Sequence, residues 1–222
     1  MKTKKLDIIY EDKNIIVVNK PSGLLTVSTT KEKEKTLFHE VSNYVKKSNP
    51  KLKIYIIHRL DKDTSGIVMF AKNKTIKYLY QSNWDKLVIK REYTAVVKGV
   101  LKEKQGIIKS YLKETKTLLV YSSSDKKNGK LAVTNYKVIK ENKRYSLLSI
   151  EIKTGRKNQI RVHMKDINHP IIGDKKYGSE KFKRLMLHAS HLVLINPITK
   201  KEMQFISNPP KIFDLFFEER KK

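Results

Sequence analysis

Five short segments between residues 90 and 152 either alternate between apolar and polar residues or are rich in β-branched residues. They cover residues 90–100, 107–112, 117–121, 131–139 and 145–152. Consecutive strands joined by short connections pair antiparallel, so this pattern predicts a meander-like, largely antiparallel sheet. The dipeptide Asn128-Gly129 lies in one connection and predicts a tight turn there.

Helical patterns separate the remaining predicted strands. Apolar residues recur at helical spacing behind Thr36, a candidate N-cap, and over residues 75–87, 156–167 and 211–220. Further strands are predicted at 6–10, 14–19, 66–71, 185–189, 191–196 and 202–206. Strands and helices mix without regular βαβ alternation, which favours an α+β fold with a largely antiparallel mixed sheet and flanking helices. Since no repeat, linker or low-complexity tract divides residues 1–222, we expect one domain.

The charge balance indicates a polyanionic partner. The chain has 49 Lys+Arg against 22 Asp+Glu, and 49 − 22 gives a net charge of +27. Compositional drift could contribute to the abundance of lysine, but drift would normally raise glutamate as well. The excess is spread along the chain, which predicts a broad basic surface for nucleic acid. An anionic membrane is the weaker alternative. No segment approaches the roughly 18 apolar residues of a membrane span, so we expect a soluble cytoplasmic protein.

The absence of cysteine excludes disulfides, cysteine-ligated zinc, iron–sulfur clusters and thiol nucleophiles. Four histidines near the C-terminal end, His163, His169, His188 and His191, suggest a metal site, but no His-Glu-x-x-His pattern accompanies them. His163 lies beside Met164 in a predicted helix, where packing is the commoner role. We therefore expect neither a metal nor a cofactor.

A carboxylate at the edge of the predicted sheet is the first candidate for chemistry. Asp61 follows an apolar run at residues 54–57 and precedes a turn at Thr64-Ser65-Gly66. Active-site groups are commonly presented at such edges. The alternative is that Asp61 and Asp63 cap the turn, and local physics alone does not decide between the two.

Four segments together resemble the RluA-type pseudouridine synthases. In chain order they are Val17-Val18-Asn19-Lys20-Pro21-Ser22-Gly23-Leu24, then His58-Arg59-Leu60-Asp61 with Thr64-Ser65-Gly66, then Arg91-Glu92-Tyr93-Thr94-Ala95-Val96-Val97-Lys98-Gly99, then Thr154 to Met164 continuing to His169-Pro170 and Gly173-Asp174. Tyr177-Gly178 and Leu187-His188-Ala189 also look similar. Lys157-Asn158 stands where the family usually has Thr-His. The resemblance runs from about residue 6 to about residue 206.

The resemblance implies an enzyme that isomerises uridine to pseudouridine in ribosomal RNA, transfer RNA or both. It places the nucleophile at Asp61, which an ion pair with Arg161 would keep ionised. It implies that the ring of Tyr93 stacks on the target base, with its hydroxyl near the proton lost from C5. Arg59 would enter the space left by the extruded base. The reaction is redox-neutral, which agrees with a chain lacking cysteine and nucleotide-binding glycine motifs.

The same resemblance gives substrate-binding positions at His58, Arg59, Leu60 and Ile160. Other interpretations remain open from the residues alone. Arg161 could face a phosphate, Tyr93 could be a core residue with its hydroxyl in water, and Arg59 could contact a phosphate. We interpret Lys20 and Arg156 as solvated surface charges and leave them out of the catalytic set.

A rival hypothesis is an RNA-binding or ribosome-assembly factor that kept the fold without the chemistry. A DNA-binding protein is disfavoured, because no helix-turn-helix or zinc-finger pattern is present. The first motif begins close to Met1, so we expect a short form without the N-terminal S4-like domain of many related enzymes. We also expect a monomer without an obligate protein partner. The sequence leaves open which uridine is the target and whether Asp61 attacks the sugar, attacks the base or promotes elimination.

Overall fold

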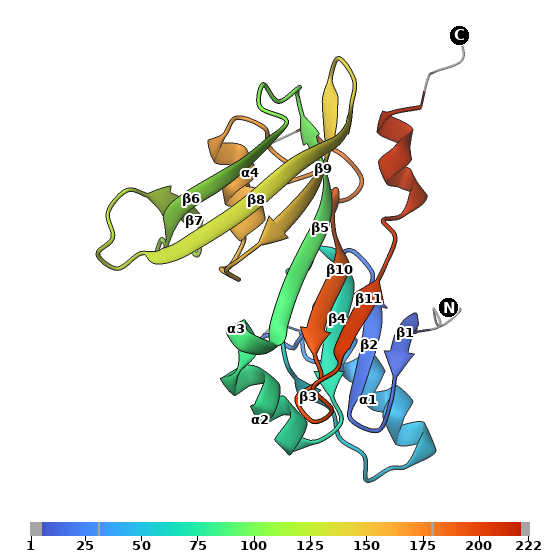
Figure 1. Ribbon diagram of the computed structural model, residues 1–222. Helices are drawn as coiled ribbons and strands as arrows, with labels where there is room; N and C mark the ends of the chain where they lie inside the picture. Colours follow the sequence, from blue (N-terminus) through green and yellow to red (C-terminus); the bar gives the residue numbers. More distant parts are fainter. Residues whose placement is uncertain (1–5, 31, 179, 219–222) are drawn as a thin grey trace. The chain divides into compact units, whose positions relative to one another are not determined.

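The computed structural model describes residues 6–30, 32–178 and 180–218, and its elements are drawn in Figure 1. Contacts divide the chain into two compact units. Unit 1 comprises Met1–Lys90 and Ala189–Asn208, and unit 2 comprises Arg91–His188 and Pro209–Lys222. The chain passes from one unit to the other three times: inside β5 (Val88–Lys98), inside β10 (Leu187–Ile195), and between Asn208 and Pro209.

Unit 1 is built around neighbouring strands in the order β1-β2-β4-β10. Their bounds are β1 Ile8–Glu11, β2 Ile15–Lys20 and β4 Ser65–Ala71, with β11 (Glu202–Ile206) paired to β10 and β3 (Tyr55–Ile56) paired to β4. The β1/β2, β2/β4, β3/β4 and β10/β11 pairs are antiparallel. All seven residues of β4 are buried, because helices cover both of its faces.

The helices of unit 1 explain why the first four residues of β2, Ile15 to Val18, are all apolar. Ile15 and Val17 belong to a core cluster with Ile76 and Tyr80 of α2 (Lys74–Ser82). On the opposite face, the ring of Phe38 in α1 (Leu37–Ser48) lies 6.2 Å from that of Phe70 in β4. Thr36 is the N-cap of α1, as predicted, and its hydroxyl accepts a hydrogen bond from the amide of His39 over 3.1 Å.

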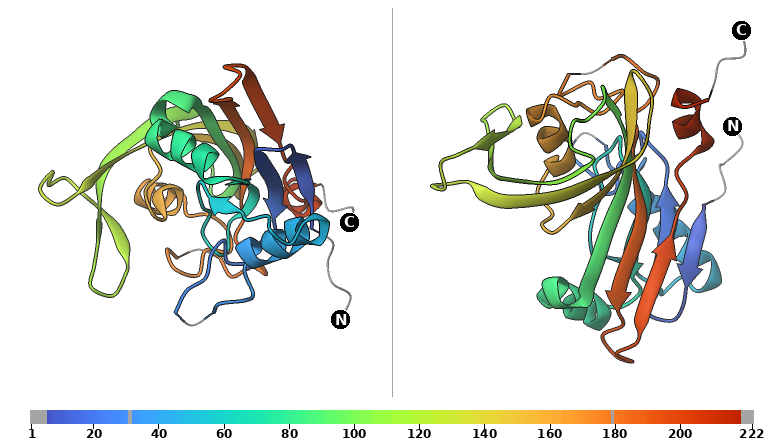
Figure 2. Two further views of the ribbon diagram at one scale, coloured as in Figure 1. Left: turned by 90° about the horizontal axis from the view of Figure 1, so that it is seen from below. Right: turned by 45° about the horizontal axis from the view of Figure 1, so that its top comes forward.

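Unit 2 contains the predicted meander. Its strands lie in the order β5-β9-β8-β6-β7, and the β5/β9, β9/β8, β8/β6 and β6/β7 pairs are antiparallel. The bounds are β6 Gln105–Glu114, β7 Val120–Ser123, β8 Lys130–Glu141 and β9 Tyr145–Ile152. The ribbon of β6, β7 and β8 extends away from the rest of unit 2 (Figure 2). Asn128 has a positive φ of 62°, which agrees with the predicted Asn-Gly turn.

One helix of unit 2, α4 (Gln159–Asp166), packs against the meander. Its Ile160 and Met164 join a core cluster with Leu148 and Ile150 of β9. Its Val162 joins a smaller cluster whose other members are Leu112, Val120, Ala132 and Tyr177. Six of the eight residues of α4 are buried, so the helix contributes polar side chains to the interior as well as apolar ones.

The α+β prediction is confirmed, since the sheet is mixed and mostly antiparallel with helices beside it. Several boundaries were wrong. The predicted helix over 75–87 is two helices, because Asn83 ends α2 and begins α3 (Trp84–Leu87), with its side-chain amide donating to the Leu79 carbonyl. The predicted helix over 156–167 begins only at Gln159.

The C-terminal predictions also need correction. The strands predicted at 185–189 and 191–196 form one strand, β10, because the carbonyl of Ser190 is paired with the amide of Ser207 and the ladder continues through this polar residue. The helix predicted over 211–220 is a 3-10 helix, η1 (Lys211–Phe216), and residues 219 and 220 lie outside the described part. Among the described residues, no helix has the length and apolar character needed to cross a membrane.

Candidate active site

Four of the predicted site residues lie on one loop of unit 1. This loop, residues 57–64, connects β3 to β4 and is called the Asp61 loop below. Asp61 is half-buried, Arg59 is exposed and Leu60 is buried. The arrangement presents the Asp61 carboxylate just before the buried strand β4, as the sequence predicts.

Hydrogen bonds to the chain segment 20–26 fix the backbone of the Asp61 loop. The Thr26 hydroxyl donates to the Leu60 carbonyl over 2.7 Å and accepts from the Leu60 amide over 3.2 Å. The Ser22 hydroxyl donates to the Asp63 carbonyl over 2.6 Å. Within the loop, the Thr64 amide donates to the Asp61 carbonyl. The backbone on both sides of Asp61 is therefore held in one conformation.

Lys20 is the centre of this arrangement. It is completely buried (0% exposed), and its ammonium group donates to the carbonyls of Pro21, Leu24 and Lys62 at 3.0, 2.6 and 2.8 Å. A lysine ammonium has three donors, and a buried charge needs such partners to offset its lost hydration. Gly23, at a φ of 87°, also donates its amide to the Lys62 carbonyl. The interpretation of Lys20 as a solvated surface charge was therefore wrong.

His58 forms a hydrogen bond with β4, the strand that follows the Asp61 loop. Its Nε2 accepts a hydrogen bond from the Met69 amide over 3.1 Å, which gives Nδ1 the proton in the neutral ring. Its ring lies 5.5 Å from that of Trp84. Met69 directly precedes Phe70 and Ala71, the residues of β4 that pair with β3, so the contact of His58 continues that antiparallel ladder. The substrate-binding role assigned to His58 stays a prediction, as does that of Leu60.

Tyr93 lies on β5 in unit 2, opposite Ile150 of β9. It is half-buried and packs against the larger core cluster of that unit. Ile160, predicted to bind substrate, is itself part of the same cluster and is 5% exposed. Ile160 therefore shapes the interior of unit 2, and a role in substrate contact stays a prediction.

Arg161, on α4, forms a buried bidentate ion pair with Asp174. Its Nε and Nη2 donate to Oδ2 and Oδ1 of Asp174, both over 2.8 Å. Burial opposes ionisation of Asp174. Hydrogen bonds and charge from Arg161, together with the amides of Lys176 and Tyr177, outweigh that effect and hold the pKa of Asp174 below its ordinary value. Arg161 is thus anchored within unit 2 by a carboxylate to which the sequence analysis gave no role.

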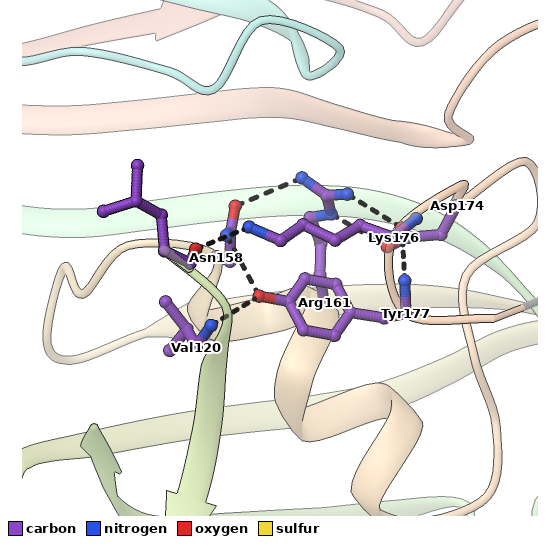
Figure 3. Close-up of polar contacts among 7 residues, drawn as sticks. Val120, Asn158, Arg161, Asp174, Lys176 and Tyr177 are labelled. Carbon is purple, nitrogen blue, oxygen red and sulfur yellow. Dashed lines mark hydrogen bonds and ion pairs between the residues drawn. The ribbon is translucent and has the colours of Figure 1, made fainter. Parts of the chain in front are cut away.

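Asn158 joins this ion pair to a tyrosine, as Figure 3 shows. Its Oδ1 accepts from Nη1 of Arg161 and its Nδ2 donates to the hydroxyl of Tyr177, both over 3.1 Å. The Tyr177 hydroxyl also accepts from the Val120 amide, and its ring lies 5.2 Å from the Arg161 guanidinium carbon. Asn158 has a left-handed backbone with φ 54°, a conformation that asparagine adopts more readily than most residues.

These contacts give a structural role to Asn158, one of the two residues that differ from the usual Thr-His of the family. The Asn158 amide serves both as acceptor and as donor between Arg161 and Tyr177. Lys157 instead forms an ion pair with Glu114 on β6. The sequence signal that could have singled out Lys20, Asn158 and Asp174 was their place within the family segments, since polar residues there are candidates for buried networks.

Two of the histidines that suggested a metal site, His163 and His169, form hydrogen bonds within unit 2. His163 is 0% exposed, with Nδ1 2.8 Å from the Thr134 hydroxyl and Nε2 3.0 Å from that of Ser110. This burial lowers the pKa of His163 to about 4, partly offset by the nearby charge of Asp166. The Nδ1 of His169 is 2.8 Å from the Lys98 carbonyl. Within residues 6–30, 32–178 and 180–218, no group of three or more His, Asp or Glu side chains is arranged to hold a metal ion.

Comparisons with known proteins agree with the resemblance. The family model for RNA pseudouridylate synthase matches residues 14–166. The chain is 41% identical over 219 residues to ribosomal large subunit pseudouridine synthase D of Borreliella burgdorferi, covering 94% of this chain and 67% of that protein. It is 35% identical over 220 residues to tRNA pseudouridine synthase C of Haemophilus ducreyi, covering 90% and 89%. It spans 66% of an uncharacterised RNA pseudouridine synthase from Mycoplasma genitalium.

Two solved structures share the fold. The human RNA pseudouridylate synthase domain containing 4 protein has a TM-score of 0.77 at 23% identity, covering 93% of this chain and 90% of the other. The human domain containing 1 protein has a TM-score of 0.78 at 22% identity, covering 97% and 90%. The family match and the relatives confirm the RluA-type resemblance, and the chain belongs to the RNA pseudouridylate synthase family.

Proposed function

We propose that the chain isomerises uridine to pseudouridine in RNA, with Asp61 as the nucleophile. The observation that carries this proposal is the rigid Asp61 loop. A buried ammonium, two hydroxyls and a glycine amide hold the backbone around one carboxylate. Holding a reacting group in one geometry before substrate binds reduces the entropy lost on the way to the transition state.

The isomerisation breaks the bond between C1′ and N1 of uridine and forms a bond between C1′ and C5. The C5 proton is lost and a proton is gained at N1, so the reaction is redox-neutral. The reaction needs a nucleophile or a general base, and a pocket that holds the uracil ring. We propose that it proceeds without metal or cofactor. An ionised Asp61 serves either attack on the sugar, attack on the base or assistance to elimination.

The roles of the other residues follow the family resemblance. Tyr93 stacks on the target base, Arg59 fills the gap left by the flipped uridine, and Arg161 stabilises the charge of Asp61. The exposure of Arg59 supports its role, because a side chain that inserts into RNA must reach beyond the loop. The anchoring of Arg161 by Asp174 and Asn158 supports a fixed orientation of its guanidinium.

The substrate class is ribosomal RNA, transfer RNA or both. The net charge of +27 supports an RNA partner, and binding should weaken steeply as salt rises, because bound phosphates release counterions. We further propose that the chain acts as a monomeric, single-domain catalytic unit in the cytoplasm without an obligate protein partner.

The test is pseudouridine mapping by carbodiimide labelling and primer extension. Unmodified ribosomal and transfer RNA are incubated with the protein or with Asp61→Ala. A stop that appears only with the unmutated protein supports the proposal and identifies the target uridine. Tight RNA binding without any stop on either RNA class would favour the assembly-factor hypothesis instead.

A further inference from the structure

We propose that a surface hollow on unit 2, between β6 and β7, binds a nucleotide of single-stranded RNA outside the target uridine. This inference rests on the proposed function and adds a second RNA contact to it. The hollow has a volume of about 550 Å³, and its lining includes Lys109, Tyr111, Lys126 and Ser122–Ser124. The lining thus combines cations, an aromatic ring and hydroxyls.

The hollow lies on a part of the meander where the two faces of the strands differ. Leu112 and Ala132 pack against Val162 of α4 in a buried cluster. Residues of opposite pleat on the same ribbon are open to solvent, including Ile107 (71% exposed) and Tyr121 (43% exposed). The open face therefore carries aromatic and apolar surface that no described element covers.

Charge complementarity identifies the occupant as a polyanion. Residues 105–141 contain eight lysines against three acidic residues, and 8 − 3 gives a local charge of +5. Lys113 is paired with Asp125. In the part of the chain that the structure describes, neither Lys109 nor Lys126 forms an ion pair with a carboxylate. These two lysines are positioned to contact phosphates at the rim of the hollow.

The tyrosines favour single-stranded RNA over a duplex. Tyr111 faces Ser123 and Lys113 faces Tyr121 in the β6/β7 register, so the two tyrosines are diagonal neighbours on adjacent strands. Bases of a single strand stack on such rings with little sequence preference, whereas paired bases are already stacked within the duplex.

The serine hydroxyls favour a ligand that donates hydrogen bonds. Ser122 donates to Asp166, since a carboxylate only accepts. The Ser122 oxygen then accepts from Ser110 over 2.9 Å, and Ser110 accepts from Nε2 of His163 over 3.0 Å. Both hydroxyl protons are committed. Because Ser122 is paired with Leu112, these serines line the hollow from the α4 side of the ribbon, and their oxygens keep lone pairs for a ligand there. A ribose 2′-hydroxyl can donate to them, and DNA lacks that group.

The experiment measures binding of a fluorescein-labelled 12-nucleotide RNA composed only of adenosine and cytidine. This probe has no uridine, so its binding is independent of catalysis, and the inference can fail or succeed separately from the proposed activity. The variant Lys109→Glu/Lys126→Glu is compared with Lys143→Glu/Lys181→Glu, a control with the same charge change at exposed positions of unit 2. A DNA strand of the same base order is measured in parallel.

We expect the Lys109→Glu/Lys126→Glu protein to bind the RNA at least ten-fold more weakly than the control. Its plot of log affinity against log salt should be shallower by about 1.4, from two phosphates at about 0.7 each. Tyr111→Leu should weaken binding about five-fold or more through lost stacking, without changing this slope. The unmutated protein should bind RNA more tightly than DNA.

Equal affinities and salt slopes for the two charge variants would overturn the inference. So would sedimentation velocity showing that the hollow variants change only self-association, because that would assign the face to a second copy of the chain. Circular dichroism of each variant checks that a lost interaction does not reflect unfolding.

Discussion

The ammonium group of Lys20 donates to the carbonyl oxygen of Lys62 over 2.8 Å, and Lys62 directly follows Asp61. This bond joins the end of β2 to the middle of the Asp61 loop. Lys20 is fully buried, and its ammonium group also donates to the carbonyls of Pro21 and Leu24. The first motif of the sequence therefore supports the loop from inside unit 1.

Lys20→Met tests this support. Methionine fills a similar volume but leaves three carbonyls without their ammonium partner, so we expect the free energy of unfolding to fall by about 2–4 kcal/mol. Because the loop loses its fixed geometry, kcat should fall more than KM rises. Urea denaturation and steady-state kinetics measure the two effects. Lys47→Met, at an exposed position of α1, is the matched control. Unchanged stability and kcat in Lys20→Met would refute the supporting role.

Two substitutions separate the contributions of Asn158 to stability, namely its side-chain hydrogen bonds and its left-handed backbone. Asn158→Gly removes the hydrogen bonds to Arg161 and Tyr177 but tolerates the backbone φ of 54°. We expect it to lower the free energy of unfolding by about 1–3 kcal/mol. Asn158→Ala loses the same bonds and also strains the left-handed backbone, which should cost about 1 kcal/mol more. Thermal or urea unfolding measures both. Equal stability of the alanine variant and the unmutated protein would contradict the bridging role.

Burial of His163 predicts that stability depends on pH. The pKa of His163 is lowered from 6.5 to about 4 in the folded protein. Between these values the unfolded chain binds a proton and the folded chain does not, so stability rises with pH. The contribution is present above pH 6.5 and is lost as pH falls toward 4, amounting to about 3 kcal/mol over the full range.

Urea unfolding between pH 6.5 and 4.5 measures this effect, because the lowered pKa of Asp174 places its titration at more acidic pH. His163→Gln should flatten the dependence. His39→Gln, at an exposed position of α1, should leave it unchanged. Identical slopes for the two variants would show that His163 does not carry the pH dependence.

The fold was largely predictable because its strands follow local patterns. Alternation over β6, β8 and β9 reflects one face packed on a core, and Thr36 lies where an N-cap is expected. The errors arose where backbone pairing overrides side-chain pattern. The polar residue Ser190 separated two predicted strands, yet its carbonyl accepts a hydrogen bond from the amide of Ser207, and the ladder continues.

The site was less predictable because burial of charge depends on tertiary contacts. From the sequence alone, a lysine such as Lys20 is expected at the surface. In the fold, three carbonyls accept hydrogen bonds from its buried ammonium group. The partner of Arg161 within unit 2 is Asp174, thirteen residues away, and composition or periodicity gives no reason to pair them. The family resemblance supplied Asp61, Tyr93 and Arg161, whose catalytic roles remain proposals.

Tyr93→Phe separates two proposed roles of this side chain. Phenylalanine keeps the ring, so stacking on the base and packing against Ile150 should persist and KM should change less than two-fold. Loss of the hydroxyl near C5 should lower kcat about 100-fold, in the range of general acid–base catalysis. Single-turnover kinetics on the mapped RNA distinguish these effects. A variant with full kcat would limit Tyr93 to stacking.

The most direct test of the central claim compares Asp61→Asn with Asp63→Asn. Both residues are half-buried on the same loop, and each substitution replaces a carboxylate by an amide of equal size. The measurement is release of tritium from C5 of labelled uridine in RNA under single-turnover conditions. We predict no detectable release with Asp61→Asn and release within a few-fold of the unmutated rate with Asp63→Asn. Sustained release by a folded Asp61→Asn protein would contradict the assignment of Asp61 as nucleophile.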